Sequence, residues 1–88
     1  MHLQFIATSP FALGVYLKSI RKNKKLNQTQ AGAKIGLEQA TVSAIENGSL
    51  GTKLDTLYRY LSALELELVV RPRDFEINPH LPKTGDRW

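Results

Sequence analysis

The sequence predicts a mostly α domain of four to five helices, followed by one short strand and a flexible C-terminal tail. Three observations predict this class. Apolar side chains recur at helical spacing through residues 10–64. Between residues 66 and 70 the spacing changes to alternation, with Leu66, Leu68 and Val70 on one face, which is typical of a half-buried strand. Residues 73–88 contain two prolines, one glycine and no sustained period, so this segment is expected to be partly disordered alone.

Composition limits the function classes. The chain has 88 residues, 42% of them apolar and 23% charged, which argues against disorder of the whole chain. A chain of this size has a marginal core, so a partner subunit is expected. There is no cysteine, which excludes disulfides, thiol nucleophiles and thiolate metal sites and fits a reducing cytosol. The two histidines, His2 and His80, lie beside the chain ends and supply a metal site poorly. We find no secretory signal or membrane-length apolar run, and expect a cytoplasmic, nucleoid-associated protein.

The charge of the chain is strongly asymmetric. The net charge is +4, and six basic side chains precede Glu38 without any acid. They are Lys18, Arg21, Lys22, Lys24, Lys25 and Lys34. Such a cluster indicates either a polyanionic partner, such as nucleic acid or an anionic membrane, or a plain solvated face.

Capping residues place the first two helices. Ser9-Pro10 predicts a helix start, because serine accepts from free amides and proline suits the first helical position. We therefore expect a helix over residues 10–23. Asn27 is a good N-cap for a second helix over residues 28–35.

Two further helices follow the turn at Gly36, where a left-handed residue is wanted. The third is expected over residues 39–47. Thr52 is predicted to cap the fourth, with Asp55 completing a weaker capping box, and the helix should reach Leu64. Its apolar stripe comprises Leu54, Leu57, Tyr58, Leu61 and Leu64.

The remaining segments are an N-terminal arm over residues 1–9, a strand over 65–72 and a tail over 73–88. A single strand cannot stand alone, because its N–H and C=O groups need a ladder. Pairing with the same strand of a second copy satisfies both edges by two-fold symmetry. The predicted dimer contacts are Leu66, Leu68 and Val70.

The register of residues 26–48 carries the functional inference. The small pair Ala31-Gly32 lies where the second helix must approach the third closely, and Gly36 makes the turn. Polar side chains open the third helix, where a major-groove reader presents its N-terminal residues. The sequence therefore predicts a helix-turn-helix DNA-binding domain over residues 10–64.

This pattern resembles the helix-turn-helix of the Cro/C1-type (XRE) repressor family, whose fold is lambda-repressor-like. The resemblance rests on Gln28, Gly36, Gln39-Ala40-Thr41-Val42-Ser43 and Ile45-Glu46-Asn47-Gly48. The family usually has leucine and alanine at the positions of Ala31 and Gly32. The glycine weakens the second helix by about 1 kcal/mol.

Features outside the motif are similar to those of HipB-type antitoxins. They are Ser9-Pro10, Gln39-Ala40-Thr41, the Leu64-Glu65-Leu66 junction and the final Trp88. The resemblance implies a dimeric, DNA-binding antitoxin of a type II toxin–antitoxin system. Such a protein pairs a strand across two subunits, represses its own operon and binds a HipA-like serine/threonine kinase toxin.

Site residues follow from the register and the resemblance. The predicted base contacts are Gln28, Gln39, Ala40, Thr41 and Ser43. Glutamine suits adenine N6 and N7, and a threonine methyl can meet a thymine methyl. Arg21, Lys34 and Lys53 are either phosphate contacts or solvated charges. Phe75 and Trp88 are candidate toxin contacts, although a tail tryptophan can also fold on its own surface.

The acidic residues are expected to have structural roles. Glu46 is predicted to be a structural partner for a basic side chain of the first helix or for a backbone amide. Glu65 and Glu67 lack any accompanying catalytic group, so they are expected to solubilise the strand. No cofactor, metal site or enzyme activity is expected. Two alternative functions stay open, a stand-alone repressor without a toxin and a protein-interaction module without DNA binding.

Overall fold

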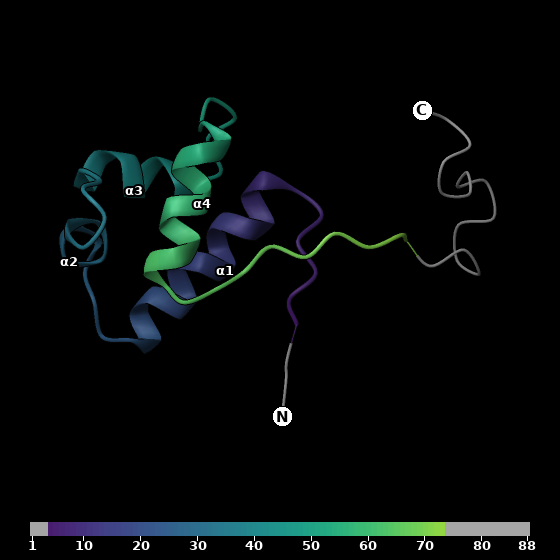
Figure 1. Cartoon of the computed structure of the whole chain (residues 1–88), viewed down its shortest axis with the longest axis horizontal. Coiled ribbons are helices and arrows are strands. Elements are labelled where there is room, and N and C mark those ends of the chain that lie inside the picture. The colour runs from purple at the N-terminus through teal and green to yellow at the C-terminus, as the bar shows by residue number, and fades with distance from the viewer. Residues whose placement is uncertain (1–3, 74–88) are drawn as a thin grey trace.

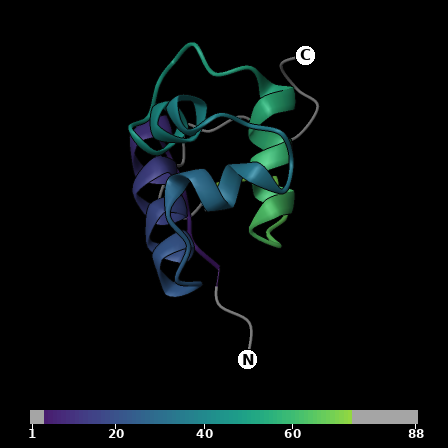
Figure 2. The ribbon, with the colours of Figure 1, turned by 90° about the vertical axis from the view of Figure 1, so that its left-hand side faces the viewer.

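The computed structural model describes residues 4–73, and in them it contains four α-helices in the predicted order (Figure 1). The helices are α1 (Pro10–Asn23), α2 (Gln28–Ala33), α3 (Gln39–Glu46) and α4 (Leu54–Ala63). Figure 2 shows α1 and α4 standing upright at two sides of the domain, with α2 lying across the space between them. The prediction of a mostly helical domain is confirmed.

The first two helices begin at the predicted caps. Ala12 N–H donates to the hydroxyl of Ser9 at 3.0 Å, and Pro10 follows at the first helical position. Asn27 Oδ1 accepts from the backbone N–H of Gln30 at 2.7 Å, while Gln30 Oε1 accepts from the N–H of Asn27 at 2.8 Å. This reciprocal capping box gives a six-residue helix a firm start.

All four helices end through the same left-handed turn, the Schellman motif. The residue in the left-handed region has φ of 60° to 77°, and the N–H of the next residue donates to the carbonyl five residues back. The left-handed residues are Lys25, Gly36, Gly48 and Glu65. The turn at Gly36 is confirmed, but α2 ends two residues before its predicted end, because Lys34 and Ile35 belong to the turn.

The start of α4 differs from the prediction. The helix begins at Leu54 with Lys53 as its N-cap, and no side chain caps it, so the capping role of Thr52 is wrong. The backbone is still extended at Lys53, with ψ of 146°, which moves the helix start past the threonine. Asp55 does lie in the first turn, where a negative charge suits the helix dipole.

The buried face of α4 is also rotated from the predicted stripe. Leu54 and Tyr58 are 64% and 49% exposed, whereas Tyr60 is completely buried. Leu57 and Leu64 do face the core. The core itself joins all four helices and contains Leu17, Ala31, Val42, Ile45, Tyr60, Leu61 and Leu64.

Gly32 accounts for the small-residue pair in α2. A Cβ built on Gly32 would lie 2.4 Å from the carbonyl oxygen of Leu37 and 3.1 Å from Val42 Cγ2. The helix-turn-helix therefore closes more tightly here than any side chain at this position allows. The lower helix propensity of glycine is the cost of this close approach.

The segment after α4 is extended, but the structure has no strand within residues 4–73. Leu68, Val69 and Val70 are 46%, 57% and 89% exposed, and a single copy offers this segment no ladder partner. Strand pairing across a dimer therefore stays a prediction. The arm is also extended, and Phe5 stacks on Tyr16 with ring centroids 4.3 Å apart.

The predicted toxin contacts, Phe75 and Trp88, lie outside the described residues. Within residues 4–73, none of the helices has the length and apolar character needed to cross a membrane.

Candidate nucleic-acid interface

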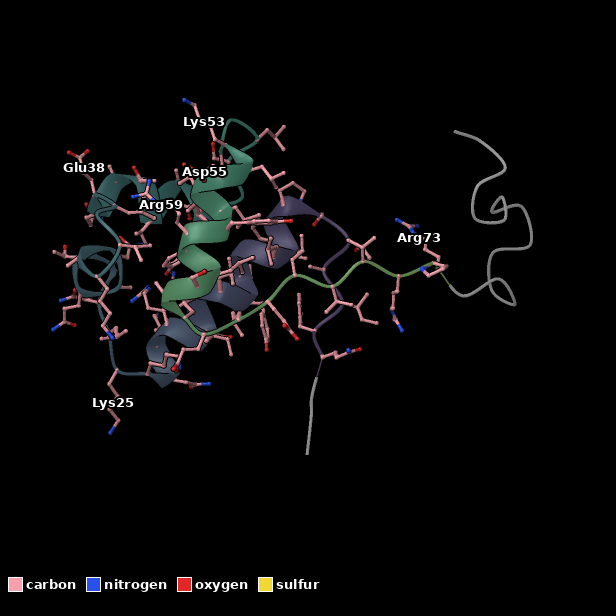
Figure 3. The ribbon with its side chains drawn as sticks, in the orientation of Figure 1. Lys25, Glu38, Lys53, Asp55, Arg59 and Arg73 are labelled. Atoms are coloured by element: carbon pink, nitrogen blue, oxygen red, sulfur yellow. The ribbon has the colours of Figure 1, made fainter. Side chains whose placement is uncertain are left out.

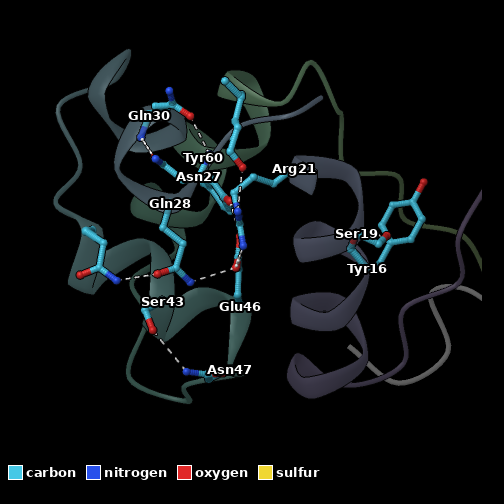
Figure 4. Close-up of polar contacts among 12 residues, drawn as sticks. Tyr16, Ser19, Arg21, Asn27, Gln28, Gln30, Ser43, Glu46, Asn47 and Tyr60 are labelled. Atoms are coloured by element: carbon cyan, nitrogen blue, oxygen red, sulfur yellow. Dashed lines mark hydrogen bonds and ion pairs between the residues drawn. The ribbon is translucent and has the colours of Figure 1, made fainter. Parts of the chain in front are cut away.

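The carboxylate of Glu46 lies at the point where the four helices meet (Figure 4). From α1, Arg21 donates twice, from Nε to Oε2 at 2.7 Å and from Nη2 to Oε1 at 3.0 Å. The hydroxyl of Tyr60, on α4, donates to Oε2 at 2.5 Å. Gln28, at the start of α2, donates from Nε2 to Oε1 at 3.1 Å. One side chain from each of the other helices thus binds this residue of α3.

These contacts fix the protonation state of the cluster. Burial alone would raise the pKa of Glu46, but hydrogen bonds from Arg21, Tyr60 and Gln28 outweigh it and hold that pKa below its ordinary value. Burial and the adjacent carboxylate raise the pKa of Tyr60. At neutral pH Glu46 is therefore a carboxylate that can only accept hydrogen bonds, and Tyr60 is a neutral donor.

The cluster reaches the surface through two glutamines. Gln39 Nε2 donates to Gln28 Oε1 at 2.5 Å, and Gln28 is half-buried while Gln39 is exposed. The two predicted base-contact glutamines are therefore brought together at the start of α3. A hydrogen bond to Gln28 therefore positions the side chain of Gln39, and a hydrogen bond to Glu46 positions Gln28.

The other predicted base contacts lie on the same helix. Ala40 is exposed, and Thr41 and Ser43 are half-buried. Gln39 and Ser43 are one helical turn apart, so they share a face of α3. Ser43 Oγ accepts from Asn47 Nδ2 at 3.4 Å.

Arg21 does not lie at the surface. The residue is 6% exposed, and its guanidinium binds Glu46 and the carbonyl oxygen of Leu26, the latter at 2.8 Å. The prediction of a phosphate contact at Arg21 is therefore wrong, because its donors face the interior. The same finding confirms that Glu46 is a structural partner for a basic side chain of the first helix.

Lys34 and Lys53, the other two candidate phosphate contacts, are exposed. In Figure 3 the side chain of Lys53 extends away from the domain beside the N-terminal end of α4. Either lysine can reach a polyanion without giving up a bond to the protein, since no salt bridge involves them within residues 4–73.

The sequence-based predictions do not include two residues that support the site, Tyr60 and Arg59. Tyr60 could have been found, because residues 57, 60, 61 and 64 have the i, i+3, i+4, i+7 spacing of a buried face. Arg59 could not, since its Nη2 donates to the carbonyl oxygen of Ile35 at 2.6 Å and so joins α4 to the turn. A contact to a distant backbone carbonyl leaves no pattern in the sequence. Across residues 4–73 no group of three metal-ligating side chains comes together.

Comparison with known proteins places this geometry in a family. A family model described as "Helix-turn-helix" matches residues 17–70. The chain is 36% identical over 62 residues to antitoxin HipB of Escherichia coli strains K12 and CFT073, with 70% of this chain aligned. The aligned segment covers 70% and 66% of these two relatives, so the chain spans about two thirds of their length. Putative antitoxin HigA2 of Mycobacterium tuberculosis is 41% identical over 61 residues, which cover 66% of this chain and 60% of that protein.

Solved structures agree with these relatives. The "HipB-O4 20mer complex" has a TM-score of 0.73 at 33% identity, and it covers 82% of this chain and 100% of the solved chain. A chain of the "Structure of HipA-HipB-O2-O3 complex" has a TM-score of 0.74 at the same identity and coverage. Family model, sequence relatives and solved folds therefore agree, and the chain belongs to the Cro/C1-type helix-turn-helix family and, within it, to the HipB-type antitoxins.

Proposed function

We propose that this protein is a DNA-binding antitoxin that reads an operator with α3, represses its own operon and neutralises a HipA-like kinase toxin. The observation that carries the proposal is the Gln39–Gln28–Glu46 hydrogen-bond series. This series links the exposed side chain of Gln39, at the start of α3, to the buried carboxylate of Glu46. Preorganised side chains at this end of a recognition helix are suited to base edges in the major groove.

In this proposal the residues of α3, together with Gln28 at the start of α2, specify the base sequence, and the lysines position the protein on the DNA backbone. Gln28, Gln39, Ala40, Thr41 and Ser43 contact bases, while Lys34 and Lys53 contact phosphates. HipB relatives are named in complexes with a 20mer and with HipA, which supports both kinds of partner. The protein would then act at the nucleoid, in the cytoplasm, without catalysis, cofactor or metal.

The proposed homodimer places two α3 helices on one palindromic site. Leu66, Leu68 and Val70 would pair across the two-fold axis. Leu66 and Leu68 line a groove between the arm and the extended segment, and Val70 is 89% exposed. Apolar side chains in an unpaired extended segment favour an intersubunit ladder over a solvated tail.

The proposed toxin contacts are Phe75 and Trp88. An aromatic side chain gains most when it leaves water for a pocket on a partner, which is why such residues anchor interfaces. A relative named as putative antitoxin HigA2, and not as HipB, is 41% identical to the chain over 61 residues, so a toxin other than a HipA-like kinase is a variant of this proposal.

DNA binding is tested by titrating a fluorescent duplex from upstream of the protein's own gene at several salt concentrations. If a dimer neutralises about 6 to 10 phosphates, affinity should fall about 10³- to 10⁵-fold between about 50 and 200 mM salt. A scrambled duplex of the same length serves as the control. Affinity that hardly changes with salt would favour the protein-interaction module without DNA binding.

A stand-alone repressor is separated from an antitoxin by a different measurement. The protein is co-expressed with the product of the neighbouring gene and purified through a tag on that product. An antitoxin should co-purify stoichiometrically and suppress the growth arrest that the neighbour causes alone. Duplex binding without either effect would establish the stand-alone repressor.

A further inference from the structure

We propose that Glu46 is a positioning residue that decides which end of the Gln39 amide faces the DNA, acting through Gln28. Glu46 itself is 3% exposed and cannot touch a base. This proposal rests on the proposed function. It adds that Glu46 determines which base is preferred at the position that Gln39 reads. We call the Glu46–Gln28–Gln39 series the amide relay.

The first step of the relay follows from the chemistry of a carboxylate. Glu46 is ionised and accepts only, so Gln28 must turn its NH2 group inward to meet Oε1. The carbonyl oxygen of Gln28 then faces outward. This assignment does not depend on any choice between amide nitrogen and oxygen, because the opposite orientation would place two acceptors against each other.

The second step transfers the same polarity to the surface. The outward Gln28 Oε1 is an acceptor, so Gln39 can meet it only with its NH2 group, and it does so at 2.5 Å. One N–H of Gln39 is thereby occupied. The carbonyl oxygen Oε1 and the second N–H of Gln39 remain for a ligand.

This free edge matches one purine better than the other. Adenine presents an N6–H donor and an N7 acceptor in the major groove, which pair with Oε1 and the spare N–H of Gln39. Guanine presents two acceptors, O6 and N7, and one of them would face Oε1. The relay therefore favours adenine at this position.

The strength of the relay comes from how firmly Glu46 is held. Arg21 and Tyr60 bind both of its oxygens, and Tyr60 and Glu46 are buried, so the carboxylate cannot turn away from Gln28. In the variant Glu46→Gln, an amide must take the place of the carboxylate. Either orientation of the amide loses one contact with Arg21. The two shorter contacts, 2.7 Å from Arg21 Nε and 2.5 Å from Tyr60, converge on Oε2, so the amide oxygen belongs there and the longer contact, 3.0 Å from Arg21 Nη2 to the Oε1 position, is the one lost.

The NH2 group of a glutamine at position 46 would then face Gln28. Gln28 must turn its oxygen inward, and its NH2 group meets the oxygen of Gln39. Gln39 is left with two outward N–H donors, which suit the O6 and N7 acceptors of guanine. A change of one buried group should thus reverse the base preference of a side chain on the surface.

The experiment measures base preference rather than affinity alone. Duplexes selected from a randomised pool by the wild-type protein give the starting site. The base pair whose preference is lost in Gln39→Ala identifies the position that Gln39 reads. That position is then varied through all four base pairs, and the dissociation constant of each duplex is measured for the wild type and the variants.

The wild type should prefer adenine over guanine by about 5- to 150-fold, the range expected of one bidentate contact. Glu46→Gln should reverse this order. Glu65→Gln, which alters an exposed carboxylate paired with Lys24, is the matched control and should keep the wild-type order. A folded Glu46→Gln variant with the wild-type order would overturn the proposal.

Gln28→Met keeps the test decisive if Glu46→Gln does not fold. Methionine cannot fix the orientation of the Gln39 amide, so Gln39 can present either its oxygen or its NH2 group to the base. The preference for adenine over guanine should then fall close to unity at that one position. Thr29→Val, at an exposed position of the same helix but outside the relay, should leave it unchanged. An undiminished preference in Gln28→Met would also overturn the relay, whereas a wild type that binds no duplex would overturn the proposed function itself.

Discussion

At the residue scale, the buried pair of Arg21 and Glu46 decides geometry more than net stability. Removing two charges from water costs several kcal/mol each, and their attraction repays this only when the remaining lone pairs and donors are satisfied. Here Tyr60, Gln28 and the carbonyl of Leu26 complete the set, and within residues 4–73 no buried side-chain polar atom is left without a partner. The pair is therefore expected to specify one arrangement of the four helices.

Breaking this pair on one side should be costly. In Glu46→Leu, the buried guanidinium of Arg21 loses its partner, and the free energy of unfolding should fall by about 3–5 kcal/mol. Urea unfolding followed by circular dichroism measures the loss. The double variant Arg21→Met/Glu46→Leu should recover part of it, since no buried charge then remains, although the buried hydroxyl of Tyr60 still lacks an acceptor. A single variant as stable as the wild type would contradict the structural role of the pair.

The pKa of Tyr60 predicts a specific loss of stability in alkali. That pKa is raised above its ordinary value of 10.0 in the folded protein, so the stabilising contribution is complete below pH 10 and disappears as the pH rises through the folded value. The melting temperature of the wild type should therefore fall above pH 10, and that of Tyr60→Phe should fall less. Identical slopes for the two proteins would show that the hydroxyl of Tyr60 titrates as it does in the unfolded chain.

At the element scale, the helix ends are the local weak points. Lys25 and Glu65 occupy left-handed turns with φ of 60° and 61°, a conformation that disfavours residues with a Cβ. Gly36 and Gly48 make the same turn without this cost. The sequence thus uses glycine at the two turns that flank α3, and tolerates strain at the ends of α1 and α4.

Relieving this strain should stabilise the domain. Lys25→Gly is expected to raise the free energy of unfolding by about 0.5–1 kcal/mol, because glycine adopts the left-handed conformation freely. Lys22→Gly, three residues earlier inside α1, should lower it by about 1 kcal/mol. Chemical denaturation of both variants gives the comparison. Destabilisation by both would mean that the turn at Lys25 is not strained.

The elements also show where sequence reasoning succeeds. α1 has the predicted bounds, and the predicted caps Ser9 and Asn27 are confirmed, because caps are local hydrogen bonds between residues three apart. The sequence predicts only the kind of partner that Glu46 has. Arg21 lies 25 residues away in the chain, and only the packing of the helices brings it to Glu46. The burial of Tyr60 is recorded in the helical spacing of residues 57, 60, 61 and 64, but the inward turn of Arg21 depends on how α1 packs against α3, which no local pattern records.

At the scale of the whole molecule, the extended segment after α4 is incomplete in one copy. Leu68 lies 46% exposed in a segment without a ladder, and the proposed dimer would bury it. Leu68→Pro removes both an apolar side chain and a backbone donor, so it should give monomers in analytical ultracentrifugation. Leu50→Ala, at an exposed leucine outside the segment, should leave the dimer intact. A Leu68→Pro variant that remains a tight dimer would place the interface elsewhere.

We propose that α3 reads DNA sequence through Gln39, and a titration on two duplexes tests this. Fluorescence anisotropy compares the wild type with Gln39→Ala on the duplex from upstream of the protein's own gene and on a scrambled duplex at the same salt concentration. The substitution should cost about 1–3 kcal/mol on the first duplex and much less on the second. Equal losses on the two duplexes, or a wild type that does not distinguish them, would show that Gln39 does not read the base sequence.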